Sequence, residues 1–516
     1  MSISEPPAAA PLPLPRGFLW GVAAIALATG VAAAVVYAGR DLTLSHYDAK
    51  AHLVVARRIF DSLTPGWRQI GAVWLPLPHV LNAVPVQLDA FYRTGSSGVA
   101  ISVACYVLMA TSLAALVWQA TRSRAAAVAA AVIAGSDPNV LYLQSTPMTE
   151  SLLFGLVAAG IALTHRWLLA GGRAGPQAAG AVLAAACLTR YEAWPITAGV
   201  AGLSWVALLR AGTSPAEATR RVLQLLLPSV LAVIAFLVLS RATVGEWFVT
   251  GGFYVPEPRL AGKGLATAGA VGWGVWKIAG SVTLTAGILG AAALLVLGLL
   301  RRRHAPALVA LALAGSLALP FYAFYKGHPY RIRYMVAPVL AVAACAGIGI
   351  GWLPRRRLRV AAAVGLAVAA LIETPPLSAG APFVQEAQWD RPKRLGRRAV
   401  TACLARGFVR PDDKILVSMG SLAHYMQELS QEGFALDDFV HEGVGQLFPE
   451  TLSSPRRHVR WILAEEEAEG GDMLTWRGRQ EPSFLEGFAR VCEGGGVALY
   501  KREPSAGARG PHAEGR

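Results

Sequence analysis

The recurrence of long, almost uncharged apolar blocks constrains this chain more than any other feature of its sequence. The stretch from Ala286 to Leu300 has no polar residue, so it lacks the polar face that a soluble helix or a half-buried strand would present. A helix needs about 20 apolar residues to cross the bilayer core. The charged fraction is 15%, against about 25% in a typical globular domain. The sequence therefore predicts an all-α polytopic membrane protein and argues against a soluble enzyme.

Eleven apolar segments have approximately the length that a membrane span requires. They are predicted at residues 18–38, 99–119, 125–143, 149–170, 177–193, 195–210, 222–241, 281–300, 305–325, 334–353 and 358–374. We therefore expect an N-terminal segment at 1–17 and a membrane domain at 18–374, in which residues 39–98 form a large first outer loop. No small-residue cleavage site ends the first block, so the first span is predicted to remain uncleaved.

Arginine clusters identify the cytoplasmic side of these predicted spans. They occupy every second loop, at Arg122 and Arg124, Arg166 and Arg173, Arg210, Arg220 and Arg221, Arg301 to Arg303, and Arg355 to Arg357 with Arg359. Basic residues in short loops mark the cytoplasm, so the N-terminus is predicted inside and, with an odd number of spans, the C-terminus outside the plasma (inner) membrane. Clusters scattered in this way account for the net charge of +15 without a nucleic-acid partner.

The first outer loop combines an acidic residue with amphipathic sequence. Asp48 precedes the segment Ala49–Leu63, whose apolar residues could lie in the membrane interface while its basic residues face head groups. Asp48 could cap the helix that begins there or act as a general base at the membrane surface, and the two roles are compatible. A second interfacial segment, rich in proline and containing His79, is predicted from Trp74 to Leu88.

Further acidic residues lie in the next two outer turns. Asp137 precedes a proline and could end one helix or cap the next. Glu150 begins an apolar block, where a buried carboxylate needs a partner such as Arg190 or a later basic residue, although the helix dipole could also favour it. Arg190, Tyr191 and Glu192 lie together at an outer span end, either as a local ion pair beside an interfacial ring or as part of a binding site.

A late outer loop breaks the positive-inside trend. It contains Lys326, His328, Arg331 and Arg333, the only dense basic group on the predicted outer face after a late span. Arginine offers paired donors to a phosphate, so these residues could bind a phosphate at the membrane surface. Alternatively, they could pair with the acidic residues of the other outer loops.

The order and sidedness of these motifs resemble the GT-C superfamily of membrane glycosyltransferases. The resemblance rests on Asp48 in the first outer loop, the proline- and aromatic-containing second segment, the acidic turn before the fourth span, the sequence LTRYE ending at Glu192 and the sequence RYMVAPVL starting at Arg333. The nearest relatives look like the protein O-mannosyltransferase and aminoarabinose-transferase branch. The resemblance covers roughly residues 18–350.

The resemblance implies transfer of a sugar from a polyprenyl-phosphate carrier to a glycan, lipid or protein acceptor outside the cytoplasm. Asp48 and Glu150 match the acidic positions of the family's catalytic site, and Arg331 and Arg333 match its late phosphate-binding position. Lys326 is grouped with these two arginines. The remaining candidates for substrate binding are His79, Asp137, Arg190, Tyr191, Glu192 and His328. No cofactor is implied, and a divalent metal is compatible with such a site but not indicated by the sequence.

The polar C-terminal part is predicted to form a small extracytoplasmic α/β domain at residues 375–502. The sequences ILVSM, VRWILA and VALYK predict strands, and SLAHYMQEL predicts a helix. Cys403 and Cys492 could form a disulfide there, because that compartment is oxidising. The glycine-, proline- and charge-rich residues 503–516 are predicted to be disordered.

Two other functions are compatible with a multi-span protein. A transporter or lipid flippase would place ionisable residues near the middle of the membrane and would often show repeated halves. Here the polar residues lie at predicted span ends, and no repeat is evident. A non-catalytic scaffold that presents the C-terminal domain would not require Asp48.

Overall fold

The computed structural model describes residues 15–172, 175–249 and 256–504. These residues form two compact units, each assembled from separate stretches of the chain. The helical unit comprises Met1–Ala49, Ala72–Asn82 and Thr94–Gln388, and the α/β unit comprises Lys50–Gly71, Ala83–Arg93 and Trp389–Arg516. Residues 1–14 and 505–516, which make up most of the predicted N-terminal segment and disordered tail, lie outside the described residues.

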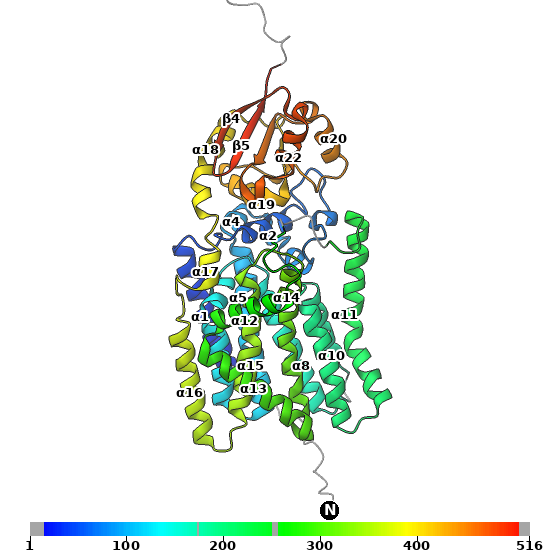
Figure 1. Ribbon diagram of the computed structural model, residues 1–516, viewed down its shortest axis with the longest axis vertical. Coiled ribbons are helices and arrows are strands. Elements are labelled where there is room, and N and C mark those ends of the chain that lie inside the picture. Colours follow the sequence, from blue (N-terminus) through cyan, green and yellow to red (C-terminus); the bar gives the residue numbers. More distant parts are fainter. Residues whose placement is uncertain (1–14, 173–174, 250–255, 505–516) are drawn as a thin grey trace, which may run out of the picture. The chain divides into compact units, whose positions relative to one another are not determined.

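The helical unit is a bundle of apolar helices (Figure 1). Its longer helices are α1 (Arg16–Gly39), α5 (Ser96–Thr121), α6 (Arg124–Ser136), α8 (Glu150–Leu169), α9 (Gln177–Cys187), α10 (Ala193–Arg210), α11 (Pro215–Val244), α12 (Gly264–Ala279), α13 (Ser281–Leu300), α15 (Pro338–Gly351) and α16 (Arg356–Glu373). Shorter elements are α3 (Leu77–Asn82), α7 (Pro138–Leu143), η3 (Arg302–Leu317), α14 (Ala318–Tyr325), η4 (Ile332–Met335) and α17 (Pro382–Glu386).

Small residues allow the central helices to approach closely. Helix α5 packs against α8, α10 against η3, and α13 against α15. At Gly155 in α8, a β-carbon would come within 2.6 Å of the backbone oxygen of Cys105 in α5, so a larger residue would push these helices apart. Such contacts are typical of helices that associate in lipid, where there is no hydrophobic driving force between them.

Seven helical segments within the described residues are long and apolar enough to cross a membrane. They are α1, α5, α8, α11, α13, η3 with α14, and η4 with α15. The other four predicted spans correspond to α6 with α7, α9, α10 and α16. The chain is therefore a multi-pass membrane protein, as the apolar blocks predict.

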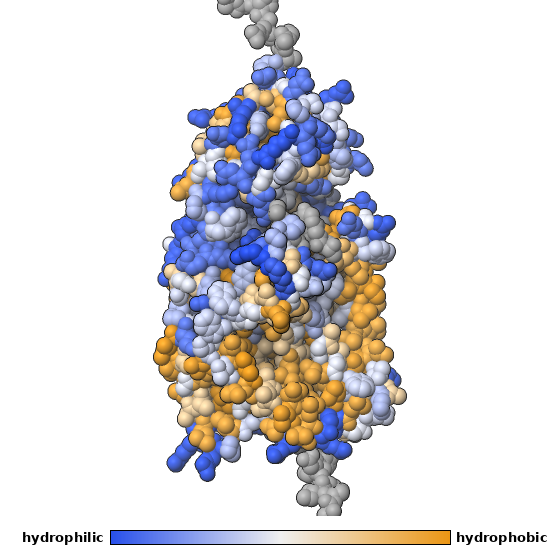
Figure 2. Space-filling view, in the orientation of Figure 1, coloured by the Kyte–Doolittle hydropathy of each residue, from blue (hydrophilic) through white to orange (hydrophobic). Residues whose placement is uncertain are grey.

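The surface of α11 shows where lipid is expected. Figure 2 shows apolar residues gathered on the surface of the helical unit. On α11 the exposed large apolar side chains recur every three or four residues, at Leu223, Leu227, Leu231, Ile234 and Val238. This spacing places them on one face of the helix. An exposed apolar face of this kind is expected to contact the acyl chains of the lipid bilayer.

One helix and one helix break differ from the sequence-based expectation. Helix α12 occupies a stretch predicted as outer loop, because its alternation of glycine and alanine with tryptophan lowers the apolar signal. The predicted span 125–143 consists of α6 and α7, since the Asp137 carboxylate caps α7 and Pro138 begins it.

The α/β unit is built on one mixed sheet with strand order β2-β1-β3-β5-β4 (Figure 1). The strands are β1 (Ile415–Val417), β2 (Phe439–Val440), β3 (Trp461–Glu465), β4 (Phe488–Gly494) and β5 (Val497–Arg502). Strand β1 pairs parallel to β2 and β3, whereas β5 pairs antiparallel to β3 and β4. The three predicted strands coincide with β1, β3 and β5, and the predicted helix with α19 (Met419–Leu429).

The other helices of this unit include α18 (Arg391–Gly407), α20 (Leu447–Ser453), α21 (Pro455–His458) and α22 (Met473–Gln480). A disulfide between Cys403 and Cys492 joins α18 to β4, as the sequence suggested was possible. Parts of residues 39–98, the predicted first outer loop, also belong here: most of α2 (Tyr47–Arg57), η1 (Trp67–Ile70), η2 (Pro85–Gln87) and most of α4 (Asp89–Thr94).

Candidate functional site

A buried ion pair between Asp48 and Arg333 is the central polar feature of the helical unit. Asp48 lies in the first turn of α2, and Arg333 lies in η4, 285 residues further along the chain. Their side chains are only 7% and 8% exposed. The Asp48 backbone N–H donates to His46 Nδ1 at 3.1 Å, which fixes the start of the helix. The sequence identified both residues and left open whether the late basic residues bind a phosphate or pair with the acidic residues, and the structure shows that Arg333 pairs with Asp48.

The Arg333 guanidinium has donor capacity that the ion pair does not use. Its buried Nε has no hydrogen-bond partner within the described part of the chain. The guanidinium carbon lies 5.2 Å from the centre of the Tyr334 ring, which supports it through a cation–π contact. A buried arginine with an unused N–H is suited to donate a hydrogen bond to a phosphate or carboxylate oxygen.

Glu386 on α17 holds the backbone of η4, and sequence reasoning missed it. Its carboxylate accepts from the backbone N–H of Ile332 at 2.6 Å and of Arg333 at 3.4 Å. Burial raises the pKa of Glu386, and these backbone donors and the positive charge of Arg333 oppose the rise. No sequence signal marks this residue, because it lies in a short polar stretch after the last span and its partners are more than 50 residues away.

A second buried ion pair joins Glu150 to Arg190. Glu150 is the first residue of α8, and its Oε1 lies 3.1 Å from Arg190 Nη1. The same guanidinium pairs with Glu192 at 2.8 Å and donates to Thr149 Oγ1 at 3.0 Å. Of the partners considered for Glu150, Arg190 is therefore the one that the structure provides. The local pair of Arg190 with Glu192 is also present.

The two ion pairs belong to one electrostatic cluster. The charge of Glu150 acts on Arg333, and the charges of Arg190 and Arg333 act on each other. Tyr47, beside Asp48 in α2, interacts with Asp48, Arg331 and Arg333. The structure thus brings together candidates from the first loop, the second outer turn, the sequence LTRYE and the late basic loop.

The remaining basic candidates lie around η4 and the end of α14. His328 is half-buried, its Nδ1 lies 2.8 Å from the Pro329 carbonyl oxygen, and burial lowers its pKa, as does the nearby charge of Arg333. Arg331 is half-buried and its charge acts on Tyr47. Lys326 is exposed, and its Nζ lies 5.9 Å from the Tyr322 ring centre.

The last three candidates make contacts that support the local backbone. Asp137 Oδ1 accepts from the backbone N–H groups of Asn139 and Val140, at 2.8 and 3.1 Å. His79 is buried in α3, with Nδ1 3.1 Å from the Leu75 carbonyl oxygen and its ring stacked on Trp74. The Tyr191 hydroxyl donates to the Val73 carbonyl oxygen at 3.2 Å. Their predicted roles in substrate binding stay predictions.

The polar cluster in the part of the chain that the structure describes consists mainly of carboxylates and guanidinium groups. No group of three or more His, Cys, Asp or Glu side chains there is gathered so that it could hold a metal ion. The polar cluster instead alternates carboxylates with guanidinium groups, an arrangement suited to proton transfer and to binding an anion.

The helical bundle, the helix that carries Asp48 and the small C-terminal sheet together form a fold that also occurs in a solved membrane protein. No family model matches the chain, and no curated protein matches it. Among solved structures, the chain is similar to ArnT from Cupriavidus metallidurans bound to undecaprenyl phosphate, with a TM-score of 0.59 and 13% identity over 95% of this chain and 99% of that chain.

The apo state of the same ArnT gives a consistent result. Its TM-score is 0.57 at 14% identity, covering 94% of this chain and 98% of that chain. The likeness therefore extends over nearly the whole length of both proteins. At this sequence identity, the structural similarity establishes the fold but not the chemistry.

Proposed function

We propose that this protein is a glycosyltransferase that moves a sugar from a polyprenyl-phosphate carrier to an acceptor on the extracytoplasmic face of the membrane. The observation that carries the proposal is the buried Asp48–Arg333 pair, with an unused Arg333 donor, in a chain with the fold of ArnT. One of those ArnT structures is bound to undecaprenyl phosphate, which is a carrier of the proposed class.

In the proposed reaction, Asp48 acts on the acceptor hydroxyl, and Arg333 acts on the carrier phosphate that leaves the anomeric carbon. Asp48 removes the proton from the acceptor hydroxyl while the hydroxyl oxygen bonds to the anomeric carbon. The bond from that carbon to the carrier phosphate oxygen breaks, and the phosphate keeps the electron pair. Arg333 and Arg331 stabilise this charge by charge-assisted hydrogen bonds.

The ion pair observed here represents the resting arrangement in this scheme. An arriving phosphate competes with Asp48 for the Arg333 guanidinium, and the unused Nε gives the phosphate a point of attachment. Glu150 and Arg190 extend the cluster and offer a carboxylate and a guanidinium to the sugar hydroxyls. The scheme routes no step through a cofactor or a metal.

The decisive experiment replaces Asp48 with Asn and measures sugar transfer in membranes from a polyprenyl-phosphate donor. Loss of the base lowers kcat by about a hundredfold or more. Insertion and folding are checked by detergent extraction and size-exclusion chromatography of both proteins. Full activity in a correctly inserted Asp48→Asn protein would refute the assignment. A panel of hexosyl and pentosyl donors, tested with lipid, glycan and protein acceptors, then defines the substrates.

A further inference from the structure

Helix α2 carries two oppositely charged residues that are held from different directions. Asp48 and Lys50 are two positions apart in this 11-residue helix. An α-helix turns by about 100° per residue, so their side chains leave the axis about 200° apart and lie on nearly opposite faces. Asp48 is in the helical unit, whereas the α/β unit begins at Lys50. The helix that presents the proposed base therefore continues directly into the α/β unit.

Lys50 is fixed by a buried network of charges in the α/β unit. It pairs with Glu428 of α19, and the two side chains are 3% and 11% exposed. Glu428 also accepts from Arg397 of α18, at 3.0 and 3.1 Å, and Arg397 in turn pairs with Asp390 at 2.7 Å. Burial by itself would raise the pKa of Glu428, but the charges of Lys50 and Arg397 lower it to about 2. Glu428 thus remains a carboxylate at physiological pH, and its charge and hydrogen bond oppose the lowering of the Lys50 pKa by burial.

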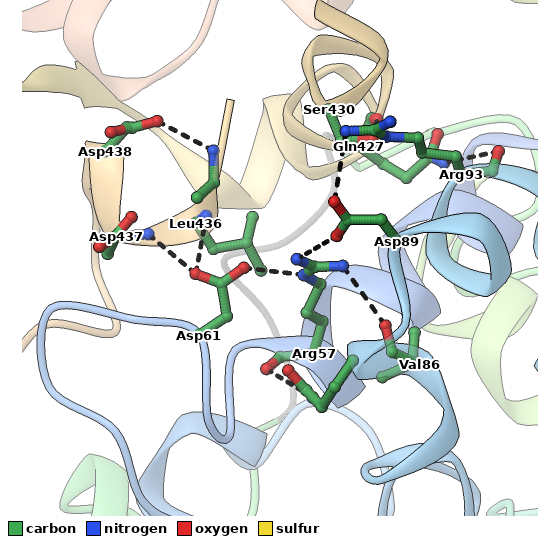
Figure 3. Close-up of polar contacts among 12 residues, drawn as sticks. Arg57, Asp61, Val86, Asp89, Arg93, Gln427, Ser430, Leu436, Asp437 and Asp438 are labelled. Carbon is green, nitrogen blue, oxygen red and sulfur yellow. Dashed lines mark hydrogen bonds and ion pairs between the residues drawn. The ribbon is translucent and has the colours of Figure 1, made fainter. Parts of the chain in front are cut away.

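The other end of α2 is held by the same unit (Figure 3). Arg57 pairs with Asp61 and with Asp89 of α4, each at 2.7 Å. The second Asp61 oxygen accepts from the backbone N–H of Leu436, at 3.0 Å, in η6 (Leu436–Asp438). The part of α2 from Lys50 to Arg57 is thus attached at two points to other elements of the α/β unit, which fixes its rotation within that unit.

A buried ionic network stabilises a helix only after the desolvation free energy of its charged groups has been offset. Apolar residues of similar size would often hold it at least as firmly, whereas charged pairs fix one geometry. Helix α2 already has buried apolar residues for adhesion, including Leu53 and Val54. We propose that Lys50, held by Glu428 and Arg397, is a positioning residue that orients Asp48 for proton transfer. This inference rests on the proposed role of Asp48 as the base.

The test replaces Lys50 with Met, which keeps an unbranched side chain as far as Cε and removes the charged Nζ. Glu428 keeps Arg397 as a partner, so the fold is expected to survive. A base that is misplaced by about an ångström loses much of its effect, so kcat falls about tenfold while KM for the polyprenyl-phosphate donor stays within about twofold. Lys50→Arg retains the charge and restores most of kcat. The matched control is Arg460→Met, which breaks a pair with the buried Asp413 elsewhere in the unit and leaves kcat unchanged.

A double-mutant cycle separates positioning from general stability. If Lys50 acts through Asp48, Lys50→Met causes no further loss of kcat in an Asp48→Asn background. Equal losses in both backgrounds, or an equal loss from Arg460→Met, would overturn the positioning role while leaving the proposed function intact. If Asp48→Asn itself retains full activity, the proposed function fails first. Should Lys50→Met not fold, Glu428→Gln provides the same cycle and must give the same non-additive result.

Discussion

At the scale of single residues, partners that lie close in sequence could be predicted, and distant ones could not. Arg190 and Glu192 are two positions apart at one span end, so their ion pair was an expected alternative. Glu150 needed some partner because it begins an apolar block, and Arg190 provides it. The pairing of Asp48 with Arg333 could not be specified, because any basic residue on the outer face was an equivalent candidate before the chain folds.

The two late arginines should differ in what they contribute. Arg331 is half-buried, whereas Arg333 is buried and paired with Asp48. Arg331→Ala removes one charged donor to the phosphate, worth about 1.5–3 kcal/mol, so KM for the polyprenyl-phosphate donor rises by about tenfold or more. Folding is nearly unaffected. Steady-state kinetics at varied donor concentration, together with thermal unfolding in detergent, measure both effects.

Arg333→Ala is the contrasting variant for that experiment. It leaves Asp48 buried without its partner, which costs about 3–5 kcal/mol, so both stability and activity fall. If Arg331→Ala reduces stability as strongly as activity, then Arg331 supports the fold and does not bind phosphate.

At the scale of elements, apolar periodicity predicts the long helices and misses elements with mixed composition. The predicted spans all coincide with helices, but α12 was missed because glycine and tryptophan interrupt its apolar signal. Strand β2 has only two residues, and the edge strand β4 has an irregular burial pattern in which the consecutive residues Arg490 and Val491 are both exposed. Such strands are defined by their neighbours in the sheet, which a local pattern does not contain.

The attachment of η4 to α17 by Glu386 should depend on pH. Burial raises the pKa of Glu386 above 4.5, its ordinary value. A carboxyl with a raised pKa in the folded state binds protons more tightly there than in the unfolded state. The folded state therefore loses stability as pH rises from about 4.5 through the raised value. Glu386→Gln keeps an oxygen for the backbone donors of η4 and removes the titration, so this part of the pH dependence disappears.

Thermal unfolding of the detergent-purified protein between pH 4 and 8 measures this difference. Glu450→Gln is a suitable control, because Glu450 is exposed on the surface of α20. An unchanged pH profile in Glu386→Gln would show that Glu386 does not titrate differently in the folded protein.

At the scale of the whole molecule, the composition change near residue 375 predicts a second domain but not all of its parts. Lys50–Gly71 and Ala83–Arg93 precede that change by almost 300 residues, yet they belong to the α/β unit. Their amphipathic pattern suits a membrane interface as well as a protein surface, so the sequence alone could not distinguish the two. The ion pairs of Lys50 with Glu428 and of Arg57 with Asp89 show that these segments form a protein surface within the α/β unit.

The side of the membrane on which the α/β unit lies can be tested directly. Arginine clusters in alternate loops and an odd number of spans predict that the C-terminus is outside the cytoplasm. The disulfide between Cys403 and Cys492 is consistent with this, because disulfides persist in oxidising compartments. A C-terminal fusion to a reporter that is active only outside the cytoplasm should therefore be active, whereas a fusion truncated after Arg303 should be inactive. An active cytoplasmic reporter at the C-terminus would contradict the odd span count.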